Sequence, residues 1–341
     1  MIVSRTGGCA LVLALALCGG ARAQFTEQQK LAGSDEGAGD RFGGSVSVSG
    51  DLAVVGAQLH GAGRAYVLRL HGTQWSEEAH LGPGTGAWFG GHVSVSRDLV
   101  NGHDVLASGS VNDEQVEVYR RQDDGSWPTT PEAVLAVPGA GRFGVVAVDG
   151  DTIIVGAYLD TNDAGTEAGS AFAFHHDDTM GWTLEQQIVP PEVEPADYFG
   201  FSVAVEGNWA VIGAPGDDDL GDLSGSAYLF HRVGTVWQEC QKITGSTEVI
   251  NDTFGVSVAM SGRTIVVGAD GRSDPSYPGK AYLFERTGDH VPVLGRTTAR
   301  PLAGRCRATS SGSRCRSRIR LPSSLRRERT PMPAVRTCTD A

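Results

Sequence analysis

The feature that most constrains this chain is a Phe-Gly pair that returns five times at spacings of 47 to 56 residues. The phenylalanines of the five pairs are Phe42, Phe89, Phe143, Phe199 and Phe254. A nearly constant period of this size indicates a repeat architecture, in which each repeat is one supersecondary unit that packs on its neighbours. Such repeats build a rigid frame, so we expect the function to lie on the loops.

Each period contains four short runs with strand character. In the fourth copy, residues 200–205 alternate between apolar and small, 209–213 and 227–231 are almost entirely apolar, and 237–243 alternate weakly. A Gly-Asp or Gly-Asn dipeptide between the first two runs is a tight-turn signal. A tryptophan marks the fourth run of the first four copies, at Trp75, Trp127, Trp182 and Trp237. Four strands per period predict an all-β fold made of β-propeller blades.

A second dipeptide completes the repeat. A Gly-Ala pair follows Phe-Gly by about 14 residues, at Gly56-Ala57, Gly156-Ala157, Gly213-Ala214 and Gly268-Ala269. With these residues the chain resembles the FG-GAP repeat of integrin α-subunit amino-terminal propellers and of many bacterial secreted proteins. The resemblance implies a propeller of seven blades, of which five are recognisable here, beginning near residues 40, 87, 141, 197 and 252. The second copy diverges most, with Ala107-Ser108-Gly109 in place of Gly-Ala.

The repeats occupy residues 24–289, and the ends of this region predict an incomplete ring. Residues 24–31 resemble a fourth strand without its first three, so we expect them to complete the last blade. The first and fifth blades are then expected to expose faces meant for neighbours, and exposed apolar faces favour association.

The first 23 residues have the features of a secretory signal peptide. Arg5 is followed by a short apolar stretch, and Ala21-Arg22-Ala23 is a small-x-small cleavage site. The alternative, a membrane anchor, conflicts with the length of this stretch. We expect a secreted or extracellular protein, periplasmic or surface-bound if the source is bacterial, with no membrane span in the mature chain.

The last segment, residues 290–341, breaks the pattern. It holds 12 Arg, no Lys and two acidic residues, Glu328 and Asp340. A disordered basic tail and a nucleic-acid-binding arm are two interpretations. A third is a shifted reading frame. If suitable synonymous codons are chosen for residues 307–317, the same bases read in a shifted frame encode Gly-Asp-Glu-Phe-Gly-Phe-Ser-Val-Ser-Val, which is another copy of the repeat. We therefore predict a disordered, frameshifted remnant of a sixth repeat.

Charge and cysteine content exclude several classes of function. The whole chain has a net charge of −12 despite its basic tail, so the repeats are strongly acidic and should avoid nucleic acid. Cys240 is the only cysteine between residues 24 and 289, which excludes a disulfide scaffold. No zinc-ligand spacing, nucleophile elbow or phosphate-binding loop occurs, so we expect no catalytic activity and no certain cofactor.

Acidic loops are the one candidate for a binding site. Strands alternate in direction, so the loops between second and third strands and those between successive blades lie on one face. Clustered carboxylates in the second-to-third-strand loops can supply oxygen ligands to calcium; the candidate ligands are Asp160, Asn162, Asp163, Asp217, Asp219 and Asp222. The alternative is a solvated loop in which Asp and Asn simply favour turns.

The resemblance itself argues against carrying over the family's calcium sites. Integrin-type propellers bind calcium between first and second strands, and here that interval is only Ser49-Gly50-Asp51 or its equivalent. We therefore expect a secreted, non-catalytic propeller that binds an extracellular protein or glycan through the second-to-third-strand face. The alternatives are a structural or surface module of a larger secreted protein and an accessory domain of a truncated hydrolase.

Overall fold

The structure is a computed structural model that describes residues 27–35, 37–83, 88–97, 103–246, 250–271, 279–286 and 300–301. The described residues form strands, turns and loops and no helix, which confirms the predicted all-β fold. The chain divides into two units, residues 1–31 and 32–341, and every strand belongs to the second. Across the described residues, no helix is long and apolar enough to cross a membrane.

Among the described residues, twenty strands form five antiparallel four-stranded sheets, each built from consecutive strands. The first two sheets comprise β1 (Ser45–Ser49), β2 (Leu52–Ala57), β3 (Arg64–His71), β4 (Gln74–Leu81), β5 (His92–Ser96), β6 (Val105–Ser110), β7 (Gln115–Arg120) and β8 (Ala133–Leu135). The third and fourth comprise β9 (Phe143–Asp149), β10 (Thr152–Ala157), β11 (Ser170–Asp177), β12 (Gly181–Ile188), β13 (Ser202–Glu206), β14 (Trp209–Ala214), β15 (Ser226–Val233) and β16 (Val236–Ile243). The fifth comprises β17 (Phe254–Ser261), β18 (Thr264–Ala269), β19 (Lys280–Glu285) and β20 (Arg300–Pro301).

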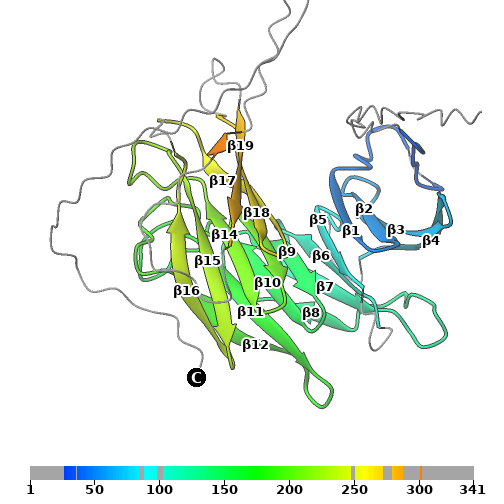
Figure 1. Cartoon of the computed structure of the whole chain (residues 1–341). Coiled ribbons are helices and arrows are strands. Elements are labelled where there is room, and N and C mark those ends of the chain that lie inside the picture. Colours follow the sequence, from blue (N-terminus) through cyan, green and yellow to red (C-terminus); the bar gives the residue numbers. More distant parts are fainter. Residues whose placement is uncertain are drawn as a thin grey trace, which may run out of the picture. The chain divides into compact units, whose positions relative to one another are not determined.

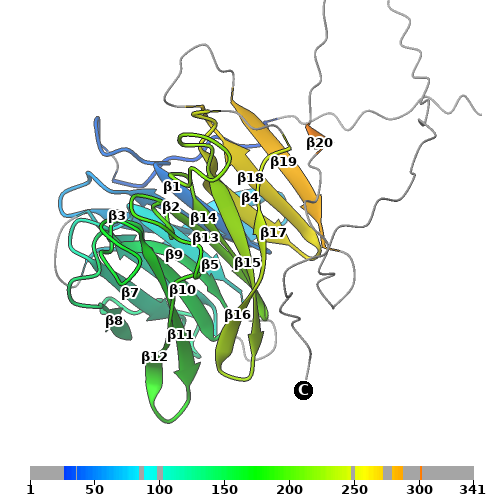
Figure 2. The ribbon, with the colours of Figure 1, turned by 90° about the vertical axis from the view of Figure 1, so that its left-hand side faces the viewer.

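The five sheets are arranged as propeller blades, as the sequence predicted. The first strand of each sheet contacts the first strand of the next, from β1 through β5, β9 and β13 to β17. These five strands line a common channel of about 510 Å³. Figures 1 and 2 show the sheets following one another in chain order. The described residues form five blades, against the seven that the resemblance implies.

The hydrophobic core lies between the sheets. Four buried clusters each combine one face of a sheet with the opposing face of the next. The cluster between the third and fourth sheets, for example, joins Ile154 and Ala173 to Ile212 and Tyr228 around Phe199, and all five are fully buried. Each sheet is therefore stabilised by its neighbours rather than by a core of its own.

The two glycines of the repeated motif contact each other between sheets. A side-chain carbon on Gly56, Gly156 or Gly213 would lie about 2 Å from the carbonyl oxygen of the Phe-Gly glycine in the next sheet: Gly90, Gly200 or Gly255. Because such a distance is far inside van der Waals contact, only glycine allows the backbones to approach this closely. The Phe-Gly to Gly-Ala spacing therefore encodes how successive sheets pack.

The second sheet departs from the prediction at its fourth strand. Trp127 was expected on that strand, but β8 begins only at Ala133, so Trp127 lies in the preceding loop. Pro128 and Pro131 explain the difference, because proline has no backbone N–H to donate to the adjacent strand. Trp127 is nevertheless buried in the cluster between the first and second sheets.

The ends of the repeat region are only partly described. Residues 27–31 form no strand, and the fourth strand of the fifth sheet is β20, which pairs with Tyr282 and Leu283 of β19. The closing strand expected at 24–31 and the domain limits stay predictions. The signal segment 1–23 lies outside the described residues, as does the tail from 290 to 341 apart from Arg300–Pro301.

Candidate ligand-binding site

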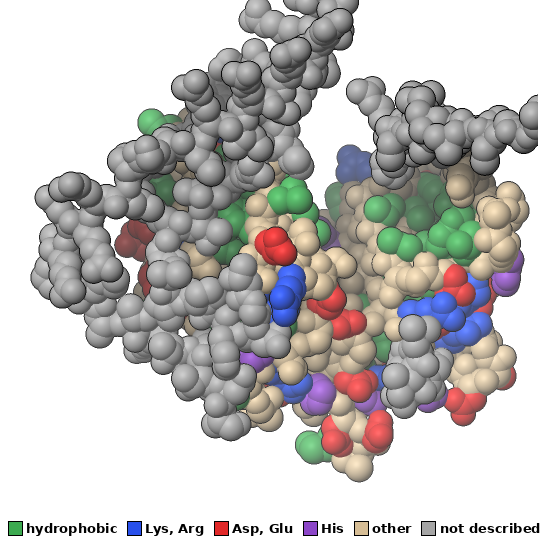
Figure 3. Space-filling view, in the orientation of Figure 1, with side chains coloured by type: hydrophobic (Ala, Val, Ile, Leu, Met, Phe, Trp, Pro, Cys, Tyr) green, Lys and Arg blue, Asp and Glu red, His purple; other side chains and the backbone are tan. Residues whose placement is uncertain are grey.

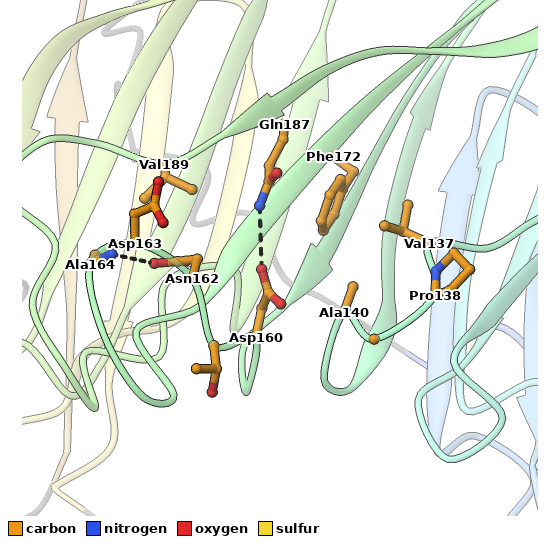
Figure 4. A pocket seen from close by; sticks show the side chains of 12 residues that line it. Val137, Pro138, Ala140, Asp160, Asn162, Asp163, Ala164, Phe172, Gln187 and Val189 are labelled. Atoms are coloured by element: carbon orange, nitrogen blue, oxygen red, sulfur yellow. Dashed lines mark hydrogen bonds between the residues drawn. The ribbon is translucent and has the colours of Figure 1, made fainter.

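A candidate site is a pocket of about 540 Å³ at the third sheet. One wall is residues 137–140, which connect the second sheet to the third, and another is residues 160–164, which follow β10. Phe172 of β11, Gln187 of β12 and Val189 complete the lining (Figure 4). Loops between sheets and loops between second and third strands therefore meet at one end of the sheets, as the alternation of strand direction predicted.

Asp160 is the buried carboxylate of this pocket. It is 6% exposed and accepts a hydrogen bond of 2.5 Å from the Ser170 hydroxyl and one of 3.4 Å from the Gln187 amide. Asn162 has a different role: its side chain accepts from the Ala164 N–H and donates to the Gly169 carbonyl, which fixes the loop. Asp163 is exposed and also lines the pocket (Figure 4).

The fourth sheet has the same carboxylate, but there it is paired with a cation. Asp217 is 2% exposed; it forms an ion pair with Lys242 and accepts hydrogen bonds from the hydroxyls of Ser226 and Tyr228. Lys242 also contacts Asp219 at 2.6 Å. Burial alone would lower the pKa of Lys242, but the hydrogen bonds to Asp217 and Asp219 outweigh it and raise that pKa, so the ammonium stays charged.

A comparison of the paired strands shows why the two carboxylates differ. In the fourth sheet Tyr228 lies opposite Lys242, and in the third sheet Phe172 lies opposite Gln187. The third sheet therefore lacks two of the groups that surround Asp217, namely the Tyr228 hydroxyl and the Lys242 ammonium. Among the described residues, no basic side chain forms an ion pair with Asp160.

Two carboxylates that precede the first and fifth sheets, at positions other than that of Asp217, also have a cation as partner. Asp252 is buried and bonds to Lys280 and Tyr282. Asp35 bonds to Arg64 and Tyr66. Asp160 differs from Asp217, Asp252 and Asp35 in that it opens onto a pocket and forms no ion pair with a described basic side chain.

The predicted calcium ligands fall into two separate groups. Asp160, Asn162 and Asp163 line the third-sheet pocket, whereas Asp217 and Asp219 share Lys242. Asp222 is exposed, and its backbone carbonyl accepts the Asn251 N–H. Within the described part of the chain, no three acidic, His or Cys side chains are grouped to hold a metal ion. At Asp217 the ammonium already supplies the positive charge that calcium would bring, and calcium binding stays a prediction.

A further carboxylate, Asp197, lies in the loop that leads into the fourth sheet. It is 3% exposed and accepts a hydrogen bond from the Glu194 N–H at 2.9 Å. Burial raises the pKa of Asp197 to about 6, against 3.8 for an unperturbed Asp, and the nearby negative charge of Asp217 adds to the increase. The hydrogen bond from Glu194 opposes it. Asp197 is therefore costly to keep ionised at neutral pH.

Replacing Asp197 with Asn should stabilise the protein at pH 7. Because the folded pKa is raised, the folded state binds more protons between about pH 4 and 6, and wild-type stability falls as pH rises through that window. The Asn side chain keeps the acceptor oxygen without the charge, so we expect a gain of roughly 1–3 kcal/mol above pH 6 and almost none below pH 4. Urea denaturation of both proteins at pH 4 and pH 7 measures this, and an equal difference at both pH values would contradict it.

Sequence reasoning missed the residues that distinguish the third-sheet pocket. Gln187 and Phe172 have no chemical signature of their own, and Lys242 lies far along the chain from the acidic loop that it neutralises. A signal was present in the repeats, because aligning the copies places Gln187 against Lys242 and Phe172 against Tyr228. The acidic loops alone did not reveal it.

Comparisons with known proteins bear on the family and the fold. A family model described as FG-GAP repeat matches residues 25–68, 141–174, 182–230 and 237–284, together just over half of the chain. No curated protein matches the sequence. Among solved structures, the chain is similar to a crystal structure of a protein from Lactobacillus plantarum, with 13% sequence identity and a TM-score of 0.49, over 76% of this chain and 69% of that one.

Proposed function

Because the chain belongs to the FG-GAP repeat family, we propose that it is a non-catalytic β-propeller that binds an extracellular partner through its second-to-third-strand loops. The third-sheet pocket is the anchor point for that partner. A signal segment at residues 1–23 supports export, since it combines a basic start, a short apolar stretch and a small-x-small cleavage site. Both a protein and a glycan remain within this proposal as partner classes.

The observation that carries the proposal is the buried carboxylate of Asp160. A carboxylate removed from water is stabilised by a positive charge at hydrogen-bonding distance. The fourth sheet supplies Lys242 in that position, whereas the third sheet leaves a pocket of about 540 Å³. A ligand that brings its own ammonium or guanidinium group satisfies Asp160 as Lys242 satisfies Asp217.

The rest of the lining agrees with a ligand that is cationic at one end and apolar beside it. Phe172, Val137 and Val189 offer apolar surface, and Asp163 adds a second carboxylate at the exposed side. An anionic ligand such as a phosphate ester would meet two carboxylates and no basic side chain in this lining. A lysine or arginine side chain of a protein, or the amino group of a glycan, has the required charge.

The test is the affinity for small cationic probes. We expect a lysine-containing peptide to bind more tightly than the same peptide with acetyl-lysine, and glucosamine to bind more tightly than glucose. Asp160→Asn should weaken the affinity for the two cationic probes by about ten- to a hundredfold. Gln187→Lys places the protein's own ammonium beside Asp160 and should abolish the preference. Titration calorimetry measures each.

Two controls make the result specific. Asp163→Asn removes an exposed carboxylate of the same pocket and should weaken binding less than Asp160→Asn. Circular dichroism spectra and melting temperatures establish that each variant is folded. Equal affinity for charged and neutral probes, or full binding by Gln187→Lys, would refute the role given to Asp160.

A further inference from the structure

Asp160 offers the third-sheet pocket only one of its two carboxylate oxygens. The Ser170 hydroxyl donates to Oδ2 at 2.5 Å, and the Gln187 amide donates to the same oxygen at 3.4 Å. Among the described residues, no group donates to Oδ1. On the premise of the binding function proposed above, we propose that the pocket selects the ammonium group of a lysine side chain on a partner protein over a guanidinium group, and that Ser170 determines this specificity.

The backbone of the loop that follows β10 explains why Oδ1 of Asp160 has no donor. In the fourth sheet, Oδ1 of Asp217 accepts the N–H of Asp219, two residues further on, at 3.2 Å. In the third sheet the residue two positions after Asp160 is Asn162, whose N–H donates instead to the Gly165 carbonyl at 3.2 Å. Because Asp160 is 6% exposed, an oxygen without a donor is costly there, and a ligand donor is favoured.

The two oxygens of Asp160 point in different directions within the pocket. Figure 4 shows one oxygen directed toward Gln187 and the other on the side of the pocket where Ala140 is drawn. The residues that line the pocket on that side are apolar, namely Val137, Pro138, Ala140 and Phe172. A ligand group that donates to Oδ1 therefore lies beside apolar side chains.

A single available oxygen favours an ammonium group over a guanidinium group. A guanidinium binds a carboxylate best through two parallel N–H···O bonds, one to each oxygen. In Asp160 the Oδ2 atom already accepts donors from Ser170 and Gln187, and each carboxylate oxygen has about two acceptor positions. The second bond of a guanidinium therefore lacks an acceptor. An ammonium is a compact point charge that needs only one oxygen, so it loses nothing at this site.

The apolar lining favours a lysine side chain over an amino sugar. The methylene groups of a lysine pack on apolar surface while its ammonium contacts a polar group, and Val137, Ala140 and Phe172 supply that surface beside Asp160. The amino group of a glycan is flanked by hydroxyl groups. Beside apolar residues these hydroxyls would lose their hydration without gaining hydrogen bonds, which costs free energy.

The charge of the chain agrees with a basic protein as the partner. The net charge is −12, and Figure 3 shows acidic side chains spread over the visible face, down to the β11–β12 turn. Complementary charge raises the association rate of a basic partner and disfavours acidic ones. A lysine on the surface of a basic protein therefore fits both the pocket and the charge around it.

The ratio of affinities for two small probes tests this specificity. In titration calorimetry, Nα-acetyl-lysine amide should bind wild type about five- to tenfold more tightly than Nα-acetyl-arginine amide, and glucosamine should bind more weakly than the lysine probe. Ser170→Ala removes the hydroxyl from Oδ2 of Asp160 and opens that oxygen to a second N–H. The arginine probe should then gain affinity, and the lysine-to-arginine ratio should fall to about one or below.

Ser226→Ala is the matched control in the fourth sheet. Ser226 donates to Asp217 at 2.9 Å, as Ser170 does to Asp160, so its replacement should leave the probe ratio unchanged. Gln187→Leu removes the other donor to Oδ2 and should shift the ratio in the same direction as Ser170→Ala. This second variant keeps the test decisive if Ser170→Ala fails to fold, which circular dichroism establishes.

The outcomes separate the lysine specificity from the binding function on which it rests. If the arginine probe or glucosamine binds wild type as tightly as the lysine probe, and Asp160→Asn weakens that binding, the binding function stands and the lysine specificity is overturned. If no cationic probe binds, both are overturned. A lysine-to-arginine ratio that stays the same in folded Ser170→Ala and Gln187→Leu overturns the role given to Ser170.

Discussion

Phe199→Ala should lower the free energy of unfolding by about 3–5 kcal/mol, because it opens a cavity in a fully packed interface. Phe199 is 0% exposed, and its ring meets the rings of Tyr228 and Phe230 at centroid distances of 5.4 and 6.1 Å. It lies in the cluster that joins the third and fourth sheets. The substitution therefore weakens both the fourth sheet and its attachment to the third.

Phe42→Ala is the matched control in the first sheet. Phe42 is only half-buried and has a single ring contact, with Tyr66 at 5.2 Å. With less area to lose and solvent already near, we expect a cost of about 1–2 kcal/mol. Urea denaturation with both midpoint and slope measured gives the two values. Equal losses of unfolding free energy in the two variants would show that Phe42 is as well covered in solution as Phe199.

Lys242→Met should cost about 3–5 kcal/mol, because it leaves the carboxylate of Asp217 buried without its counter-charge. Asp217 is 2% exposed, and without Lys242 its side chain keeps hydrogen bonds from the hydroxyls of Ser226 and Tyr228 and from the Asp219 N–H. Methionine preserves the length of the side chain, so packing changes little and the loss reports the missing charge. Urea denaturation at pH 7 measures it.

Lys242→Gln distinguishes the loss of charge from the loss of any polar partner. Glutamine at this position reproduces the third sheet, where Gln187 bonds to Asp160 at 3.4 Å. We expect a smaller loss than for methionine, together with a new preference for cationic probes at the fourth sheet. If methionine and glutamine variants are as stable as wild type, the ion pair at Asp217 is not structural, and the comparison that singles out Asp160 fails with it.

Much of the fold could be predicted because its information is local and repeated five times. The alternation of residues 200–205, the apolar run 209–213 and the intervening Gly-Asn turn placed three elements of the fourth sheet close to their observed bounds. The prediction failed at Trp127, which the repeat pattern placed on the fourth strand of the second sheet. That strand begins only at Ala133, because Pro128 and Pro131 have no backbone N–H to donate.

The candidate site could be predicted only in part from the sequence. The acidic loops and the face on which they lie followed from strand direction, and Asp160 and Asp163 line a pocket there. Which carboxylate is neutralised could not be read from the loop, because the neutralising residue comes from another strand. Lys242 lies 25 positions after Asp217 along the chain, yet their side chains form an ion pair.

The sequence by itself determined the repeat, the strand pattern and the glycine contacts that set how successive sheets pack, since each depends on residue size and periodicity at fixed spacing. Only the tertiary structure decided which charges and faces are left without partners. Burial and ion pairing depend on side chains that the fold brings together from separate strands, and so Asp160 differs from Asp217, and Val46 from Val93, although the residues themselves are the same.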